Sequence, residues 1–409
     1  MTQGLTVREV RAAFVTRREL ALFDLRTEAR FATAHPLFAA QLSLETLERE
    51  APLRLPRRDV PIVLYDDGEG LVETAQARLS ALGYRAVYKL QGDLAAWRDA
   101  GYELFQDVNS YSKAFGELVE SRRHTPSLSA PELHALIERG ADIAVLDARR
   151  YDEYHTMSIP TGTSVPGAEL VLRAKSAAPN PSTLVVVNCA GRTRSIVGAQ
   201  SLINAGVPNP VVALRNGTIG WTLAGQKLET GQTRLPPPLA ADDVLAARAR
   251  ARSVAYRAGV RQITREELAQ LERDASRTLY RFDVRSEHEY AAGHVAGFLS
   301  AAGGQLVQET DMLAPVRGAR IVLSDDLGAR ADMTASWLAQ MGWEVYVLSD
   351  GDYRDASPAV PRPRPTTGRY KRPYEGTDNA AAAMQAYLDW EYGLVAQLER
   401  DGSHGFFVI

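Results

Sequence analysis

The chain contains very little cysteine: Cys189 is the only one among its 409 residues. A single thiol excludes an internal disulfide framework and any metal site that needs several cysteines. No apolar run reaches the roughly 18 residues that a transmembrane helix needs, so the sequence predicts no membrane span. The first residues also lack the apolar core of a signal peptide. We therefore expect a cytoplasmic protein.

The chain also has little net charge. Its 47 Lys and Arg residues nearly balance its 50 Asp and Glu residues, which leaves a formal net charge of −3. This balance gives no electrostatic reason to bind nucleic acid or an anionic membrane, and we expect neither partner. His134 and His155 have no partner residue at metal-ligand spacing, so we expect no metal and no other cofactor. The length suggests two to four domains of roughly 100–150 residues each.

Two motifs recur three times along the chain. The first is an Asp-x-Arg motif at the end of an apolar run. The second is a later apolar run that ends in each copy at Asp or Cys. The spacing between successive copies is the same for both motifs, 123 positions and then 136 positions. Equal offsets for two separate motifs indicate three copies of one unit. The first motif begins at Asp24, Asp147 and Asp283, and the second ends at Asp66, Cys189 and Asp325.

Each copy alternates short apolar runs with helical patterns. Such an alternation predicts parallel β-sheets with helices on both faces, in which ligands bind beyond the carboxyl ends of the strands. Cys189 follows directly after one of these runs and is therefore expected at such an edge. We predict three α/β domains over residues 1–110, 122–235 and 255–358, with a Pro-rich linker and a C-terminal helix over residues 359–409.

Three connections are predicted between and after these domains. Residues 106–127 are polar and should connect the first two copies. A connecting helix is expected over residues 241–251, and residues 361–368 should be extended because they are rich in proline. A last helix from about residue 379 to residue 400 has an apolar stripe and should dock on a domain or on a partner subunit.

The residues around Cys189 predict an unusual local structure. A β-branched run ends at Asn188, a six-residue loop runs from Cys189 to Arg194, and a helical pattern starts at Ser195. Converging loop amides and a helix N-terminus form an anion site and favour a thiolate over a thiol. Two arginines in the loop act in the same direction. The alternative is a small buried cysteine that packs as a hydrophobe, which leaves the arginines unexplained.

The loop and its flanks resemble the active-site loop of the rhodanese family of sulfurtransferases. The resemblance implies that Cys189 is the nucleophile, which accepts a sulfane sulfur as a persulfide and passes it to a thiol, to cyanide or to another nucleophile. It also implies three tandem rhodanese-like domains with doubly wound parallel sheets. The cradle for the transferred group would consist of Ala190, Gly191, Arg192, Thr193 and Arg194, with Ser195 opening the helix.

The loop arginines favour thiosulfate as the donor. We expect at least one of Arg192 and Arg194 to contact this dianion directly. Thr193 either donates its hydroxyl to the substrate or satisfies a loop carbonyl. The acceptor could be glutathione, thioredoxin or a carrier protein, and the chain could form a homo-oligomer.

Other residues near the site are expected to be structural. Asp147 and Arg149 belong to the Asp-x-Arg motif, which recurs in copies without a cysteine, so they should tie the strand end to a neighbouring loop. Glu153 could pair with Arg149. Asp66 and Asp325 stand at the cysteine position of the first and third copies. A carboxylate cannot form a persulfide, and we expect both copies to lack activity.

Two other functions compete with sulfur transfer. Related phosphatases carry Cys-x5-Arg, whereas Cys189 and Arg194 form the shorter Cys-x4-Arg, which in the family accompanies sulfur substrates. A non-catalytic sulfur carrier or scaffold is conceivable because two copies are degenerate, but the intact middle loop argues against it.

Overall fold

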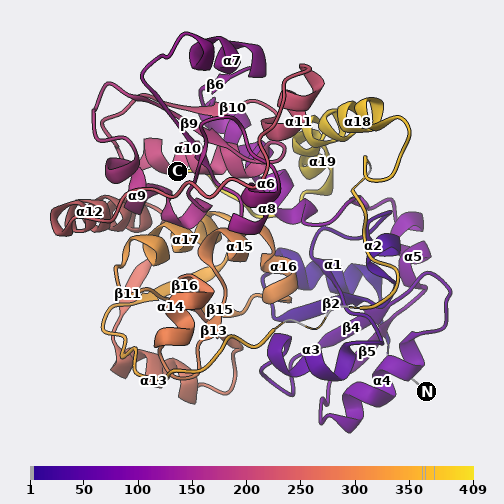
Figure 1. Ribbon diagram of the computed structural model, residues 1–409. Helices are drawn as coiled ribbons and strands as arrows, with labels where there is room; N and C mark the ends of the chain where they lie inside the picture. The colour runs from indigo at the N-terminus through magenta and orange to yellow at the C-terminus, as the bar shows by residue number, and fades with distance from the viewer. Residues whose placement is uncertain (1–3, 362, 364, 373) are drawn as a thin grey trace.

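The computed structural model describes residues 4–361, 363, 365–372 and 374–409. Three separate β-sheets form three units that follow one another along the chain (Figure 1). The first unit is drawn in indigo, the second in purple to magenta and the third in orange, and the yellow C-terminal helices lie beside the second unit. The expected class is confirmed: three α/β units with parallel sheets, followed by C-terminal helices.

The first unit contributes five strands to a six-stranded sheet of order β1-β5-β4-β2-β14, in which β3 also pairs with β2. All pairs within this unit are parallel, whereas β14 comes from the third unit and pairs antiparallel with β2. The elements are β1 (Gly4–Leu5), α1 (Val7–Val15), β2 (Leu20–Asp24), α2 (Glu28–Phe31), β3 (Ala39–Gln41), α3 (Leu47–Arg54), β4 (Ile62–Tyr65), α4 (Val72–Ala81), β5 (Val87–Leu90) and α5 (Asp93–Asp99).

The second unit has a five-stranded parallel sheet of order β6-β10-β9-β7-β8. Its central strand β9 is an apolar run that is buried from its second residue onward, as expected for a strand covered on both faces. The elements are β6 (Ser127–Leu128), α7 (Ala130–Glu138), β7 (Ile143–Asp147), α8 (Tyr151–Thr156), β8 (Thr163–Ser164), the 3-10 helix η1 (Gly167–Glu169), α9 (Leu170–Ala177), β9 (Leu184–Asn188), α10 (Thr193–Asn204), β10 (Val211–Leu214) and α11 (Gly217–Leu223).

The third unit repeats this sheet in the order β11-β16-β15-β12-β13, again with parallel pairs only. Its remaining strand, β14, extends the first sheet instead. The elements are β11 (Arg261–Ile263), α13 (Arg265–Arg273), β12 (Leu279–Asp283), α14 (Glu287–Ala292), β13 (Leu299–Ser300), α15 (Gly303–Gln308), α16 (Thr310–Leu313), β14 (Val316–Arg317), β15 (Arg320–Ser324), α17 (Ala329–Gln340) and β16 (Glu344–Leu348).

The same local signals shape corresponding elements of the three units. The first helix of each unit begins with a capping box, in which a Ser or Thr side chain and a Glu three residues later satisfy each other's backbone amides. These pairs are Thr6 and Glu9, Ser129 and Glu132, and Thr264 and Glu267. Repeated start signals of this kind explain why the periodic sequence folds into repeated helices.

The Asp-x-Arg motif forms the same buried tie in each unit. In the second unit, Arg149 donates hydrogen bonds of 2.9 and 2.7 Å to the two carboxylate oxygens of Asp147 and one of 2.6 Å to the carbonyl of Met157. In the other two units the arginine also donates to the aspartate of its own motif and to the carbonyl eight residues after the arginine. Arg26 donates to Asp24 and Ala34, and Arg285 donates to Asp283 and Gly293. The motif thus holds each strand end to the loop that follows.

The connections between units are helical and more deeply packed than the sequence indicates. Residues 106–127 contain α6 (Ser110–Arg123), and most of its first ten residues are buried. Phe115 of α6 lies between Trp337 of α17 and Phe406 near the C-terminus, with ring centroids 5.9 and 5.4 Å apart. The expected polar connection is therefore part of the core. The predicted helix after the second unit is α12 (Ala241–Arg257), six residues longer than expected at its C-terminal end.

The C-terminal region differs from the single helix that the sequence predicts. It forms α18 (Ala380–Tyr392) and α19 (Leu394–Asp401), which meet at Gly393. The two helices pack on α6. Positions 362 and 364 of the Pro-rich stretch lie outside the described residues.

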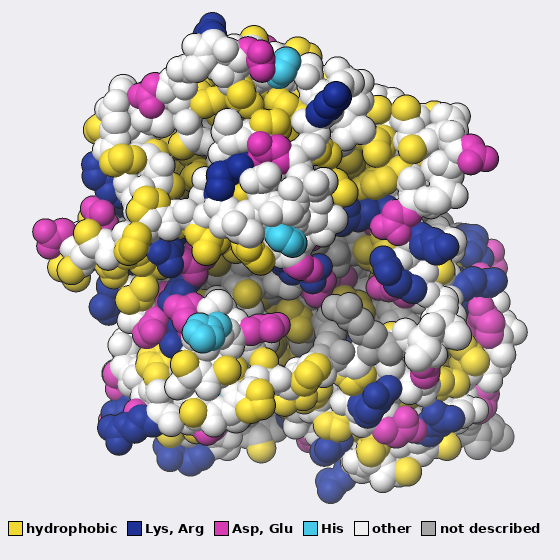
Figure 2. Space-filling view, in the orientation of Figure 1, with side chains coloured by type: hydrophobic (Ala, Val, Ile, Leu, Met, Phe, Trp, Pro, Cys, Tyr) yellow, Lys and Arg dark blue, Asp and Glu magenta, His cyan; other side chains and the backbone are white. Residues whose placement is uncertain are grey.

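None of the helices in the described ranges combines the length and the apolar character that a bilayer crossing demands. Side chains of both charges are scattered over the face seen in the space-filling view (Figure 2).

Candidate active site

Cys189 lies at the carboxyl end of β9, in the central position of the second sheet. Its loop is shorter than expected because α10 begins at Thr193 rather than at Ser195. Two amides at the start of α11 hold the loop from outside: Thr218 donates to the carbonyl of Cys189 at 2.9 Å, and Ile219 donates to the carbonyl of Ala190 at 3.0 Å. These bonds fix the loop carbonyls on the side facing α11.

The backbone amides of residues 190–194 have no acceptor among the described residues. The hydroxyl of Thr193 is also buried and without a partner among these residues, so it does not satisfy a loop carbonyl. Unpaired donors around a helix N-terminus form an anion-binding site. The loop therefore has an open cradle beside Cys189.

In the first and third units, a carboxylate of the chain itself fills this cradle. Asp66 accepts hydrogen bonds from the amides of Gly68 and Leu71 at 2.9 and 2.7 Å. Asp325 accepts from the amides of Leu327 and Arg330 at 3.2 and 2.8 Å. Both aspartates stand at the position of Cys189 in the repeat. An external anion would have to displace a buried carboxylate from these two cradles.

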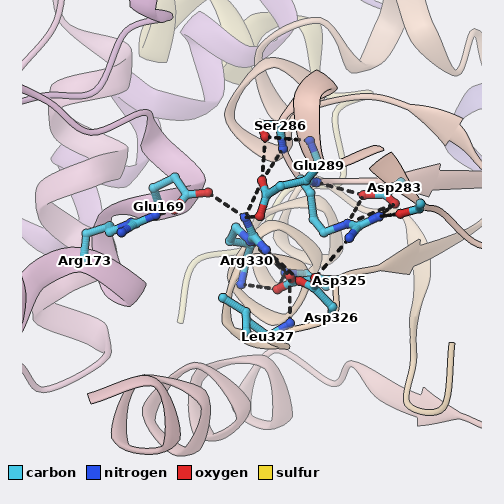
Figure 3. Close-up of polar contacts among 12 residues, drawn as sticks. Glu169, Arg173, Asp283, Ser286, Glu289, Asp325, Asp326, Leu327 and Arg330 are labelled. Carbon is cyan, nitrogen blue, oxygen red and sulfur yellow. Dashed lines mark hydrogen bonds and ion pairs between the residues drawn. The ribbon is translucent and has the colours of Figure 1, made fainter. Parts of the chain in front are cut away.

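The third unit surrounds its filled cradle with further negative charge. Figure 3 shows the guanidinium of Arg330, which corresponds to Arg194, among four carboxylates. Arg330 pairs with these four groups at 2.8 to 2.9 Å: Asp325, Asp326, Glu289 and Glu169, the last from the second unit. No net positive charge is left there to attract an anion.

The thiol of Cys189 is buried, with 2% of the residue exposed. It lies 3.5 Å from the hydroxyl oxygen of Ser195, which in turn donates to the carbonyl of Arg192 at 2.8 Å. Burial raises the pKa of the Cys189 thiol, while the charge of Arg194 and the hydrogen bonds of Ser195 act in the opposite direction. The expected lowering of this pKa is therefore wrong, because the loss of hydration on burial outweighs the charge of one nearby guanidinium.

The two loop arginines have different surroundings. Arg192 is buried and held by Glu117 at 2.7 and 2.8 Å and by Glu120, both on α6, and it stacks on the ring of Tyr392 with 3.8 Å to the centroid. Its charge is already balanced by α6. Nothing in the sequence motif indicates these partners, because α6 lies between the repeats.

Arg194 is the arginine that acts on the thiol. It forms two hydrogen bonds to Glu153 of α8, at 2.7 and 3.0 Å, and its charge opposes the rise in the pKa of Cys189. The sequence suggests that Glu153 pairs with Arg149. In the structure Glu153 pairs with Arg194 instead. The third unit keeps the same pair as Arg330 and Glu289, so the repeat itself contained the signal for this contact.

The C-terminal segment covers the cysteine and forms a cavity of about 110 Å³ over it. Residues on this segment that line the cavity with Cys189 include Tyr370, Arg372, Tyr374, Tyr387 and Glu391. Tyr370 donates to a carboxylate oxygen of Asp107 at 2.7 Å, and Arg372 lies 3.5 Å from Glu153. The sequence predicts a docked helix here but not its place over the site.

In residues 4–361, 363, 365–372 and 374–409, no cluster of His, Cys, Asp or Glu could hold a metal ion.

Comparison with known proteins agrees with this geometry. The rhodanese-like domain family matches the chain three times, over residues 6–100, 129–224 and 264–353. The chain belongs to the rhodanese family. Only its middle copy carries the cysteine.

Solved structures give the same assignment. A thiosulfate sulfurtransferase from Pseudomonas aeruginosa is 48% identical, with 100% of both chains covered and a TM-score of 0.96. This rhodanese is accordingly an enzyme of the sulfurtransferase type.

More distant structures match single parts of this rhodanese. A protein from Anabaena sp. is 22% identical over 26% of this chain and 83% of its own, with a TM-score of 0.24. A protein from Bacillus halodurans is 20% identical over 27% and 81%, with a TM-score of 0.23. A search of curated proteins found no match.

Proposed function

We propose that this rhodanese moves a sulfane sulfur from thiosulfate, or a similar anionic donor, to a thiol or cyanide through a persulfide on Cys189. The open amide cradle beside Cys189 is the observation that carries the proposal. The two other units fill the same cradle with Asp66 and Asp325. Residues 122–235 would then be the catalytic domain, and residues 1–110 and 255–358 would serve structural roles.

The first half of the reaction uses the cradle as an anion site. The sulfur of Cys189, as a thiolate, attacks the outer sulfur of thiosulfate. The bond between the two sulfurs of thiosulfate breaks, and sulfite leaves with the electron pair. Arg194 and the amides of residues 190–194 supply positive charge to the donor and then to the outer sulfur of the persulfide. The charge of Arg194 and the hydrogen bonds of Ser195 support the thiolate, which burial disfavours.

In the second half, an acceptor attacks the outer sulfur of the persulfide. The sulfur–sulfur bond to the enzyme breaks, and Cys189 leaves as a thiolate. No oxidant or reductant is needed, because the sulfane sulfur and its formal oxidation state pass from one nucleophile to the next. Glutathione, thioredoxin or a carrier protein could serve as the acceptor, and the cytoplasmic location and a homo-oligomeric state stay predictions from the sequence.

Substitution of the only cysteine tests the mechanism. We expect the wild-type protein to gain one sulfur atom by mass spectrometry on addition of thiosulfate, and to form thiocyanate when cyanide follows. Cys189→Ser should do neither while keeping the melting temperature of the wild type, because no other thiol exists.

Three results would contradict the proposal. Thiocyanate formation by a folded Cys189→Ser variant would exclude a persulfide on this residue. Hydrolysis of an aryl phosphate without thiocyanate formation would favour the phosphatase alternative. A persulfide that no acceptor discharges would favour a sulfur carrier.

A further inference from the structure

A carboxyl group from outside the three units lies against the loop of Cys189. Glu391 belongs to α18, beyond the last match to the rhodanese-like domain, and only 1% of it is exposed. A Cβ atom added to Gly191 would lie 3.1 Å from Oε2 and 3.8 Å from Oε1 of Glu391. The carboxyl can therefore touch the loop because residue 191 is a glycine. Glu391 and Cys189 line the same cavity.

The two oxygens of this carboxyl have different surroundings. The hydroxyl of Tyr387, one turn earlier on α18, donates to Oε1 at 3.1 Å. No residue within the described ranges bonds to Oε2, which is buried. A buried acceptor without a partner destabilises the folded state, and more so if it is charged, so such groups in native proteins call for an explanation. A ligand in the shared cavity would supply the missing partner.

The groups around Glu391 keep it close to its titration point at neutral pH. Burial raises its pKa to about 7. Lys113 and Arg192 oppose this rise by their charges and Tyr387 by its hydrogen bond, whereas the carboxylate of Glu117 adds to it. The negative charge of Glu391 in turn raises the pKa of Cys189. The carboxyl can thus gain and lose a proton under ordinary conditions.

We propose that Glu391 is a catalytic residue of the second half-reaction, the base that takes the proton from a small thiol acceptor. This assignment rests on the proposed persulfide mechanism. The S–H bond of the acceptor breaks and its proton passes to Oε2. The acceptor sulfur attacks the outer sulfur of the Cys189 persulfide, and the bond between that sulfur and Cys189 breaks. The proton then passes from Glu391 to the released thiolate or to water.

The proposal separates acceptors by whether they bring a proton. A glutathione thiol has a pKa near 8.5 and is mostly protonated at about pH 7, but it ionises without help at about pH 10. Cyanide at about pH 10 is already an anion. Removing a general base lowers a rate by about 10²–10⁴-fold, and only for the substrate whose proton must move.

The test is the variant Glu391→Gln, with Asp389→Asn as the matched control, since Asp389 is an exposed acid on the same helix. Stopped-flow measurement of sulfite release from thiosulfate reports the first half-reaction, and discharge of the persulfide by glutathione or cyanide reports the second. We expect Glu391→Gln to release sulfite at least as fast as the wild type, because the charge that raises the pKa of Cys189 is gone. Its transfer of sulfur to cyanide at about pH 10 should not fall, because cyanide brings no proton there. Transfer to glutathione should fall about a hundredfold or more at about pH 7 and recover toward the wild-type rate at about pH 10. Asp389→Asn should match the wild type throughout.

Other outcomes overturn the assignment. An unchanged rate with glutathione at about pH 7, or an equal loss at both pH values, would show that Glu391 does not take this proton. Loss of sulfite release in the variant would show that Glu391 supports the loop instead. Absence of sulfite release in the wild type would defeat the persulfide mechanism itself, and is thus distinguishable from failure of the role of Glu391.

Discussion

At the scale of single residues, the two loop arginines look equivalent in the sequence but have different roles in the structure. Arg192 is neutralised by Glu117 and Glu120 and is part of the packing between the loop and α6. Arg194 shares its charge with one carboxylate, Glu153, and acts on the thiol. The arginine of the Cys-x4-Arg spacing therefore acts on the pKa of the thiol, whereas the arginine of the Cys-x2-Arg spacing pairs with α6.

We expect the two truncations to separate stability from chemistry. Arg194→Ala removes charge-assisted contacts worth roughly 1.5–3 kcal/mol to the donor, which should slow sulfite release about tenfold or more, and it should raise the pKa of Cys189 further. Arg192→Ala leaves the Glu117 carboxylate buried without its partner, which should lower the free energy of unfolding by about 3–5 kcal/mol.

Thermal denaturation, titration of thiolate absorbance and sulfite release per folded molecule measure these effects. A large loss of donor turnover in a stable Arg192→Ala protein, together with no change in Arg194→Ala, would reverse the two assignments.

At the scale of elements, the short helix α11 determines the shape of the catalytic loop. Its first amides bind the carbonyls of Cys189 and Ala190, and its first residue, Gly217, lies almost against them. A Cβ atom at Gly217 would meet the carbonyl oxygen of Cys189 at 2.3 Å and that of Gly191 at 2.8 Å, both backbone atoms. The φ angle of Gly217 is also positive, at 53°.

Gly217→Ala should therefore displace the loop. Overpacking of this kind costs about 1–3 kcal/mol, and the positive φ adds strain of about 1–2 kcal/mol. We expect lower thermal stability and a loss of sulfite release greater than the loss of stability explains. Gly225→Ala is the matched control, because Gly225 also has a positive φ, of 74°, but a Cβ there meets open space. Equal effects of the two substitutions would show that strain alone, and not the contact with the loop, is responsible.

The elements also show which parts of the fold could be predicted. The repeated motifs predict the parallel sheets and the place of Cys189 at a strand end, because each unit buries its own apolar runs by local rules. They do not predict the burial of α6 or the place where α18 docks, because both depend on contacts between units that no local periodicity records. The break at Gly393 and the positions of Glu117 and Glu391 beside the loop are also not predictable from the repeated motifs. The charge of the loop was predicted well, but its neutralisation by α6 was not.

At the scale of the whole molecule, the third unit contacts the second through the loop that corresponds to the loop of Cys189. Arg330 bridges Asp325 in its own loop and Glu169 next to α9 of the catalytic unit. The third unit thus keeps the arginine that corresponds to Arg194 and surrounds it with carboxylates of the chain. We propose that the copies without a cysteine have a structural role.

Asp325→Cys in a Cys189→Ala background should accordingly fail to restore sulfur transfer. Arg330 would remain paired with Glu169, Glu289 and Asp326, and these carboxylates would repel a dianionic donor. Thiocyanate formation from thiosulfate and cyanide measures the outcome, with Cys189→Ala alone as the baseline. Turnover close to that of the wild type would show that the cysteine alone, without a cationic cradle, is sufficient.

Because β14 pairs with β2, the first sheet can be completed only late in the synthesis of the chain. Residues Val316 and Arg317 of the third unit complete the sheet of the first by pairing with Ala21 and Leu20. A ribosome adds about 5–20 residues per second, from the N-terminus onward. The first sheet therefore emerges with part of one edge unpaired and waits for most of the remaining chain to be translated. During that interval the nascent protein exposes an apolar strand edge, where chaperones and neighbouring nascent chains can bind.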